Sequence, residues 1–291
     1  METGSLSLAD VPGGFDLQAT VESAQSFRWS RADGDAYGAA TAHGGDAWYH
    51  TVADGDVVWV RQVDDRLAWR ATGDVADLLV ERFRLGDDLD AVFASFPTDE
   101  PLATARAAPP GLRVVSDPFF PTLVSFICSA RLTVGRIHAL VNALAEAFGD
   151  AVEADGATYH AFPRPAQLAA ASEAALRDLG LGFRAPYVAE TAAMVADGDV
   201  SRTALDGGYE SARGELQRFP GVGPKVADCV ALFGLGYLAA VPIDTWTRRI
   251  LERHYPDLAR DGYQTTGDAV REYFGPRAGY AQTYLYHYFR E

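Results

Sequence analysis

The sequence predicts an α+β protein in which an N-terminal antiparallel β-sheet domain with helices, residues 1–116, precedes an all-α domain, residues 117–291. Three observations support this fold class. Between Ser26 and Thr72, short runs rich in β-branched and aromatic residues alternate with turn sequences such as HGGD and ADGD. A segment that holds four of the fifteen prolines, PLATARAAPPGLRVVSDP, then interrupts the pattern. Beyond Asp117 the apolar residues recur with helical spacing.

The sheet is expected to be a meander built from five short runs. These runs are SFRW, AYGAATA, AWYHTV, VVWVRQ and RLAWRAT. The four tryptophans within them, Trp29, Trp48, Trp59 and Trp69, are interpreted as core or sheet-face residues. The amphipathic stretch 74–96 predicts one or two helices packed on the sheet.

The second half predicts an array of about nine helices joined by short connections. The clearest pattern is Ile137, Leu140, Val141, Leu144 and Phe148, which follows the helix N-cap candidate Thr133 and ends before Gly149. The remaining helices are expected at 119–129, 172–179, 186–197, 209–218, 224–234, 244–255, 266–274 and 277–290.

Composition narrows the class of protein. The chain is 48% hydrophobic and has no apolar run near the roughly 20 residues of a membrane span, so we expect no membrane association. Its first residues lack the pattern of a secretory signal. Cys128 and Cys229 are too far apart in sequence for a metal motif, so no metal site is expected. An intracellular, reducing location, in the cytoplasm or nucleoid, fits best.

The formal net charge of −15 argues at first against a nucleic-acid partner, because phosphate binding usually draws on a basic surface. However, 24 of the 25 basic residues are arginine and the one lysine is Lys225. An acidic, lysine-poor surface is what we expect of a protein from a halophilic organism, where concentrated salt screens repulsion. Salt adaptation is therefore a hypothesis that keeps DNA open as a partner.

The segment 209–235 predicts a tight helical hairpin. A helix runs into Pro220-Gly221-Val222-Gly223-Pro224, and the next helix begins at once with proline in its first turn. The glycines allow positive φ angles and keep side chains out of the turn. Backbone amides around Gly221, Val222 and Gly223 would then face outward at a helix N-terminus, where they can hold a phosphate. A well-made interhelical turn with no ligand is the alternative interpretation.

Lys225 favours a functional hairpin over a simple interhelical turn. A lysine kept in an arginine background indicates chemistry that needs a free amine, and its place in the first turn of a helix is expected to favour loss of its proton. Asp244 follows nineteen residues later in VPID, at the N-cap of the next helix. The pair indicates a nucleophile and a carboxylate beside it; a solvent-facing lysine and a simple cap are the alternatives.

FPGVGPKVADC followed by VPID resembles the signature of the helix-hairpin-helix DNA glycosylase superfamily. Within it, SAQSFRW, FICS, LGLGFRAPY and GYAQTYLY resemble stretches of the eukaryotic-type 8-oxoguanine DNA glycosylases. Endonuclease III is set aside because its iron–sulfur cluster needs cysteines that do not follow Cys229 here. The all-α half is thus expected to be a helix-hairpin-helix glycosylase domain.

The resemblance implies a pocket for an extruded base. Cys229 and Tyr286 match the residues that sandwich the base, and Gln282 matches the one that bonds its Watson–Crick edge. Ala24 stands where the family usually has the glycine whose carbonyl recognises the N7 hydrogen of 8-oxoguanine. The added methyl group makes base choice a point to test.

The resemblance also implies contacts with the base opposite the lesion. Arg136 and Arg184 match arginines that bond the orphaned cytosine, and Phe183 matches a wedging aromatic residue. Arg131 replaces an asparagine wedge, which predicts relaxed dependence on the opposite base. Trp246 replaces a histidine, with no predicted consequence.

The predicted reaction is bifunctional. Neutral Lys225 attacks C1′ as the base departs, Asp244 stabilises the developing charge, and a Schiff base leads to β-elimination. No cofactor is required, although a monovalent cation at the hairpin is possible in principle. The expected partner is double-stranded DNA with 8-oxoguanine opposite cytosine, bound by a monomer. The alternatives are a related glycosylase for another oxidised or alkylated base, and a non-enzymatic DNA-binding module.

Overall fold

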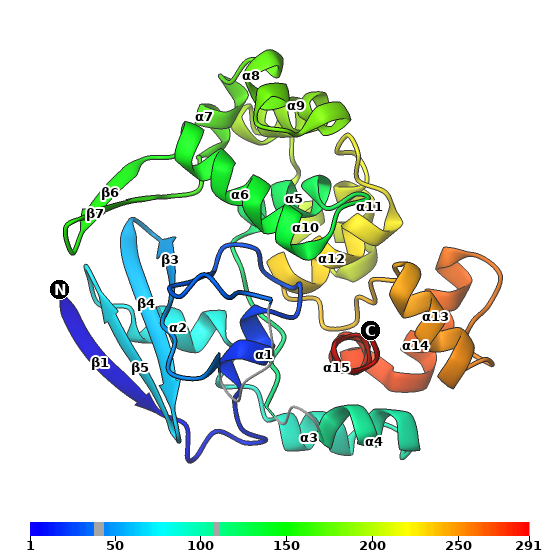
Figure 1. The fold of residues 1–291 in the computed structure, drawn as a ribbon. Coiled ribbons are helices and arrows are strands. Elements are labelled where there is room, and N and C mark those ends of the chain that lie inside the picture. Colours follow the sequence, from blue (N-terminus) through cyan, green and yellow to red (C-terminus); the bar gives the residue numbers. More distant parts are fainter. Residues whose placement is uncertain (38–43, 108–110, 291) are drawn as a thin grey trace.

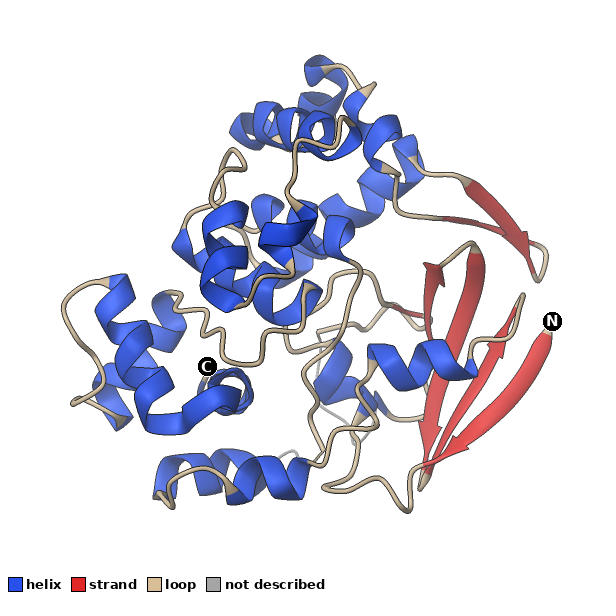
Figure 2. Cartoon of the chain, turned by 180° about the vertical axis from the view of Figure 1, so that it is seen from behind, coloured by secondary structure: helices blue, strands red, loops and turns tan. Residues whose placement is uncertain are grey.

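The protein has a sheet on one side and helices around the rest, as Figures 1 and 2 show from opposite directions. The computed structural model describes residues 1–37, 44–107 and 111–290. The main sheet is antiparallel in the order β1-β5-β4-β3-β2. Its strands are β1 (Glu2–Ser7), β2 (Ser30–Arg31), β3 (Tyr49–Ala53), β4 (Asp56–Val63) and β5 (Arg66–Ala71). The predicted α+β fold class is confirmed.

The turn between β3 and β4 shows why the meander forms. Asp54 and Gly55 have φ angles of 51° and 93°, the two positive values that a tight two-residue hairpin turn requires. Ala53 therefore pairs directly with Asp56. The ADGD sequence that separates the two predicted runs is this turn.

The sheet differs from the prediction at its edges. SFRW forms no strand, and β2 begins only at Ser30, after that run. The run AYGAATA falls largely on 38–43, outside the described residues. At the other edge β1 pairs with β5 although its sequence was not predicted as a strand. Because β1 is an edge strand with mostly exposed or half-exposed residues, it lacks the apolar alternation that identifies a strand.

The predicted helices are present, and the structure adds two short ones that were not predicted, at Pro165–Ala169 and Arg202–Leu205. Each predicted helical segment coincides with a helix whose ends lie within three residues of the expected ones. Thr133 and Gly149 flank the long helix as expected. The α-helices are α1 (Leu17–Val21), α2 (Ala76–Arg82), α3 (Leu89–Ala94), α4 (Glu100–Ala107), α5 (Phe119–Cys128), α6 (Val134–Phe148), α7 (Pro165–Ala169), α8 (Glu173–Asp178), α9 (Ala185–Ala196), α10 (Arg202–Leu205), α11 (Tyr209–Leu216), α12 (Pro224–Gly234), α13 (Thr245–His254), α14 (Tyr263–Phe274) and α15 (Ala278–Phe289), with short 3-10 turns at Gly182–Arg184 and Gly275–Arg277.

The second half also contains a β-hairpin that the helical prediction missed. Strands β6 (Ala151–Ala154) and β7 (Ala157–His160) pair across a turn formed by Asp155 and Gly156, with φ angles of 53° and 76°. The Asp-Gly pair is the signal that could have revealed it. Its strands are largely exposed, so the apolar pattern was weak.

The core explains where the first-half helices lie. Leu79 of α2 packs in the sheet's own core, as predicted, but α3 does not pack on the sheet. The ring of Phe93 in α3 instead meets that of Tyr284 in α15 edge-on at 4.8 Å. In Figure 1, α3 and α4 accordingly lie directly below α15. This packing fixes α15, which carries two of the predicted pocket residues.

Among the described residues, no helix combines the length and apolar character needed to cross a membrane.

Candidate active site

The hairpin between α11 and α12 requires glycine at one of its two positions. Gly221 has a φ of 77°, and a Cβ there would lie 2.7 Å from the ring of Tyr187. Gly223 is different: its backbone is extended at φ −87°, and a Cβ would meet nothing within 4 Å. Only Gly221 therefore uses the positive φ that glycine allows, whereas at Gly223 the missing side chain leaves the N-terminus of α12 open.

Beside this hairpin lies a pocket that unites the residues predicted for base binding and catalysis. Its walls come from the segment after α1, from α5, α12 and α15, and from the connection before α13. Its lining residues are Ser23, Ala24, Gln25, Phe126, Lys225, Cys229, Phe233, Pro242, Asp244, Gln282, Thr283 and Tyr286. Segments more than 250 residues apart in sequence thus meet at one site.

Lys225 lies in the first turn of α12, enclosed by the pocket. Its Nζ lies 5.3 Å from the centroid of the Phe126 ring, and the thiol of Cys229 lines the same pocket. Burial opposes the ammonium form, but the surrounding Cys229, Asp244 and Tyr286 outweigh burial and raise the pKa of Lys225. The expectation that the helix terminus favours the free amine is wrong for the resting site, because these neighbours stabilise the positive charge.

Cys229 lies one turn after Lys225 and is buried. Burial, opposed by the nearby Lys225, raises the pKa of this thiol to about 11. A thiol with such a pKa is neutral near pH 7, so it offers a soft, polarisable surface rather than a second nucleophile.

Asp244 is the N-cap of α13, as predicted. Its Oδ1 accepts a hydrogen bond of 2.7 Å from the backbone N of Thr247. The same carboxylate acts on the charge of Lys225 across the pocket. The cap therefore holds the carboxylate in place while its charge faces the amine, so the two interpretations of Asp244 are compatible.

Gln282 and Tyr286 face the pocket from successive turns of α15. Nε2 of Gln282 donates a 3.0 Å hydrogen bond to the hydroxyl of Thr247. The hydroxyl of Tyr286 accepts from Arg290 at 3.3 Å, and the guanidinium carbon of Arg290 lies 5.0 Å from the Tyr286 ring centroid. Both pocket side chains are thus held by neighbours outside the pocket.

Ala24 adopts a left-handed conformation with a φ of 65°. Such a conformation costs an L-residue roughly 1–2 kcal/mol, which a glycine would avoid. The following residue anchors it: Gln25 donates to the carbonyl of Arg113 at 2.9 Å and accepts from the N of Val115 at 3.1 Å. The structure therefore keeps the strained backbone that the family's glycine would adopt freely.

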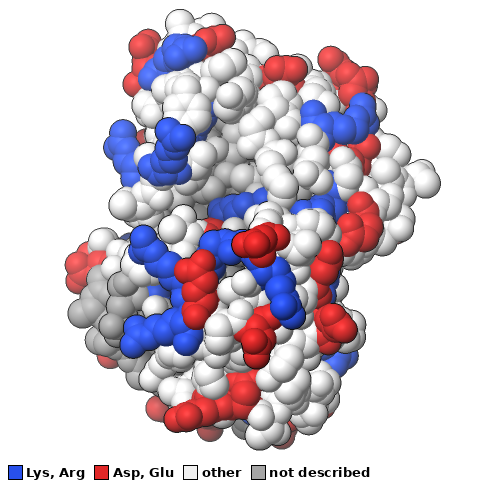
Figure 3. Space-filling view, turned by 90° about the vertical axis from the view of Figure 1, so that its right-hand side faces the viewer, with Lys and Arg blue, Asp and Glu red and all other residues white. Residues whose placement is uncertain are grey.

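A wider groove opens from the pocket and carries basic residues despite the acidic composition. It shares Ala24, Lys225 and Asp244 with the pocket. Arginines and a tryptophan extend it, namely Arg131, Arg248, Arg290 and Trp246. Figure 3 shows blue side chains gathered along the hollow between the upper and lower parts of one face. Anionic DNA can thus meet a locally basic surface.

The four residues predicted to contact the opposite base do not all line the groove. Arg131 lines the groove in a left-handed conformation, φ 59°, whereas Arg136 lies outside the groove lining. Phe183 is exposed and projects next to Arg184. Arg184 itself is buried and donates to the carbonyl of Ala130. In this conformation it supports the loop before Arg131 rather than facing a ligand.

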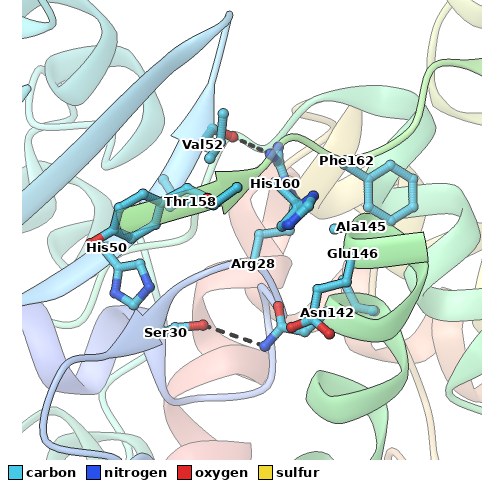
Figure 4. Close-up of a pocket in the computed structure, with 13 residues that line it drawn as sticks. Arg28, Ser30, His50, Val52, Asn142, Ala145, Glu146, Thr158, His160 and Phe162 are labelled. Carbon is cyan, nitrogen blue, oxygen red and sulfur yellow. Dashed lines mark hydrogen bonds between the residues drawn. The ribbon is translucent and has the colours of Figure 1, made fainter. Parts of the chain in front are cut away.

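A second pocket lies between β3, β7 and α6 and contains none of the predicted catalytic residues. Figure 4 shows Arg28 donating to the carbonyl of Val52, and Asn142 donating to Ser30 at 3.4 Å.

Sequence reasoning missed several lining residues, of which Phe126 bears most on the chemistry. It belongs to the FICS stretch, so the resemblance contained the signal. Its ring faces the Lys225 amine and stacks on Phe233 at a centroid distance of 5.7 Å. An aromatic wall of this kind stabilises a cation beside it.

A helical hairpin, a lysine in the first turn of its second helix and a carboxylate facing that lysine across an enclosed pocket are the features of a DNA glycosylase with lyase activity. Sequence comparison gives the family. A model of the HhH-GPD superfamily of base excision DNA repair proteins matches residues 124–276, and one of the 8-oxoguanine DNA glycosylase N-terminal domain matches residues 8–123. The chain belongs to this superfamily and carries both of these domains.

Individual relatives agree. The N-glycosylase/DNA lyase of Saccharomyces cerevisiae is 34% identical over 82% of this chain and 68% of its own length. A probable N-glycosylase/DNA lyase of Methanothermobacter thermautotrophicus is also 34% identical, over 68% of this chain and 70% of its own. The structure of the Clostridium acetobutylicum 8-oxoguanine glycosylase/lyase, bound to double-stranded DNA with cytosine opposite the lesion, aligns with a TM-score of 0.84 and 28% identity, covering 95% of this chain and 92% of that one.

Proposed function

We propose that the protein excises 8-oxoguanine from double-stranded DNA and then cuts the strand as a lyase, with Lys225 as nucleophile. The observation that carries this proposal is the single pocket in which Lys225 and Asp244 meet Cys229, Gln282 and Tyr286. The family membership and the relatives named as glycosylase/lyases support it.

Base recognition follows from the walls of the pocket. The damaged nucleotide must leave the stack, because its glycosidic bond is unreachable inside the duplex. Its base would lie between the thiol of Cys229 and the ring of Tyr286, with its Watson–Crick edge toward Gln282. The carbonyl of Ala24 would accept the N7 hydrogen that 8-oxoguanine has and guanine lacks.

The chemistry begins with a proton transfer, since the resting Lys225 is an ammonium. Once the proton is lost, the Nζ lone pair forms a bond to C1′ while the bond from C1′ to the base breaks. The departing base carries away the bonding electrons and takes up a proton. Asp244, held by its cap, stabilises the positive charge that develops on the sugar.

Strand cleavage uses the same covalent link. Opening of the sugar ring gives a Schiff base between Lys225 and C1′. A C2′ proton then passes to water, the electrons of that C–H bond form a C2′–C3′ double bond, and the phosphate leaves with the electrons of the C3′–O bond, which cuts the strand 3′ to the lesion.

The hairpin would hold the DNA backbone through its amides. Gly221, Val222 and Gly223 present these groups at the N-terminus of α12, where a phosphate is favoured. The carbonyls of Phe219 and Gly223 accept from Val222 and Ala227. The carbonyls of 220–222 are therefore the position that we propose for a monovalent cation.

We also propose that the protein binds DNA as a monomer.

Recognition of the opposite base is proposed to be relaxed. Arg131 replaces the wedging asparagine of the family, and Arg184 already donates to the carbonyl of Ala130, which leaves fewer of its N–H groups for cytosine. Excision opposite each of the four bases tests this. Comparable rates would support relaxed dependence, whereas a steep preference for cytosine would contradict it.

Borohydride trapping tests the proposal as a whole. A covalent complex should form with duplex DNA that contains 8-oxoguanine, and Lys225→Gln should abolish it. If Lys225→Gln still traps DNA, the nucleophile is assigned wrongly. A panel of duplexes with other oxidised or alkylated bases separates the related glycosylases, and DNA binding without any trapping would indicate a binding module.

A further inference from the structure

A buried carboxylate lies on the helix that carries Lys225. Asp228 is 1% exposed and immediately precedes Cys229 on α12. Its Oδ1 accepts from the hydroxyl of Tyr209 at 2.7 Å and from Nε of Arg213 at 2.9 Å. Its Oδ2 accepts from the hydroxyl of Tyr263 at 2.6 Å. The two tyrosine hydroxyls and the charged guanidinium of Arg213 thus stabilise the buried carboxylate.

Of the three donors to Asp228, Tyr263 is the one that also contacts the backbone of Ile243. Because its hydroxyl proton goes to Asp228, its oxygen remains an acceptor, and the backbone N of Ile243 donates to it at 3.2 Å. Ile243 directly precedes Asp244. A single tyrosine from α14 therefore joins the Lys225 helix to the backbone next to the catalytic carboxylate.

That link matters because of what separates the two catalytic residues. Residues 235–244 run from the end of α12 to the start of α13 without helix or strand. The regular hydrogen bonds of a helix or sheet therefore do not set where Asp244 lies relative to Lys225. The bridge from Asp228 through Tyr263 to Ile243 supplies a fixed connection across this gap.

We propose that Tyr263 is a positioning residue for the reaction, which sets Asp244 against Lys225 by bridging Asp228 to the backbone of Ile243. The inference rests on the proposed roles of Lys225 and Asp244. Loss of the bridge lets the connection before α13 shift, and a misplacement of about 1 Å can cost about a hundredfold in rate.

Tyr209 provides a matched control. Tyr263→Phe and Tyr209→Phe each remove one hydroxyl donor from the same carboxylate, but only Tyr263 contacts Ile243. The measured quantities are the single-turnover rate of base excision at saturating enzyme and the affinity for duplex DNA with a stable abasic-site analogue. The unfolding midpoint of each variant shows whether the two lose comparable stability.

The expected result is a rate lower by about 10- to 100-fold for Tyr263→Phe and by less than about threefold for Tyr209→Phe, with DNA affinity unchanged in both. The pH profile of trapping should also move to lower pH in Tyr263→Phe alone, because a displaced Asp244 stabilises the Lys225 ammonium less. Equal effects in the two variants, or a loss of DNA affinity that explains the slower rate, would overturn the proposal.

If Tyr263→Phe does not fold, hydrogen exchange on the unmodified protein still tests whether the bridge to Ile243 exists. The Ile243 amide should exchange slowly, and rapid exchange would show that no bridge holds it. Lys225→Gln separates the two proposals. If it still traps DNA, the proposed function fails; if it abolishes trapping while the two tyrosine variants behave alike, only the role of Tyr263 fails.

Discussion

Nε2 of Gln282 donates a 3.0 Å hydrogen bond to the hydroxyl of Thr247, whose backbone N donates to Oδ1 of the helix cap Asp244 at 2.7 Å. One residue in the first turn of α13 thus contacts both the side chain predicted to read the base and the carboxylate predicted to assist its departure. Thr247 and Gln282 are both buried, so this arrangement is shielded from competing water. Thr247 thus joins the side chain proposed for base selection to the carboxylate proposed for the chemistry.

Replacing Thr247 by valine should weaken base selection. The backbone bond to Asp244 stays, but the Gln282 amide loses its partner and can turn over, presenting a donor where the guanine-type edge also has donors. We expect excision of 8-oxoguanine to fall about tenfold, consistent with about 1–2 kcal/mol for one buried hydrogen bond. Single-turnover kinetics on the lesion panel measure it. Thr122→Val, which loses one buried hydrogen bond to the carbonyl of Pro118 outside the pocket, is the control; equal losses in both variants would refute the role of Thr247.

The raised pKa of Lys225 predicts a rising pH profile. Only the neutral amine attacks, and below the pKa its fraction grows about tenfold per pH unit, so trapping should accelerate from about pH 7 to about pH 9 without a plateau. The free energy of unfolding depends on pH in the opposite direction. The charged pair stabilises the fold below the ordinary lysine pKa, and this contribution is lost as pH rises through the raised value.

Trapping rates on abasic-site DNA across this range measure the effect without the base-excision step. In Asp244→Asn the profile should shift to lower pH, because one of the charges that holds the ammonium is gone. If the trapping rate of the unmodified enzyme stops rising below about pH 8, the raised pKa of Lys225 is contradicted.

Ala24→Gly should relieve backbone strain and sharpen base choice. At a φ of 65° glycine avoids the left-handed penalty, partly offset by its greater freedom when unfolded, so the free energy of unfolding should rise by about 0.5–1 kcal/mol. Removal of the methyl group should increase the ratio of 8-oxoguanine to guanine excision. Asp155→Gly relieves a similar φ of 53° far from the pocket and should change stability alone. A lower ratio in Ala24→Gly would refute the proposed recognition by this segment.

The acidic surface predicts a need for salt. With a net charge of −15, repulsion between carboxylates is screened over about 3 Å at 1 M salt but over about 10 Å at 0.1 M. Dialysis from about 2 M to about 0.1 M KCl should therefore lower the unfolding midpoint or cause aggregation. Circular dichroism follows the change, and sucrose in place of salt should not rescue it. An unchanged midpoint in dilute buffer would rule out salt adaptation.

The amino-acid sequence was sufficient to predict the longer helices of the second half, but not the short helices α7 and α10, and it indicated the chemistry proposed for the hairpin. Helical periodicity, the Gly-Pro turn and the solitary Lys225 are local signals, because each depends on residues within a few turns of one another. The resemblance then supplied Gln282 and Tyr286, which no local pattern connects to Lys225. The hairpin of β6 and β7 was missed although Asp155-Gly156 indicated it, because exposed strands lack an apolar face.

Only the tertiary structure decided how these residues act on one another. The pKa of Lys225 depends on Cys229, Asp244 and Tyr286, which come from three separate helices or their caps, and together these neighbours reverse the effect expected from the helix terminus alone. The bridge from Asp228 through Tyr263 to Ile243 and the contact between Gln282 and Thr247 likewise join distant segments. Sequence periodicity records which face of a helix is buried, whereas the distance between two buried polar groups is set by the packing of whole elements against each other.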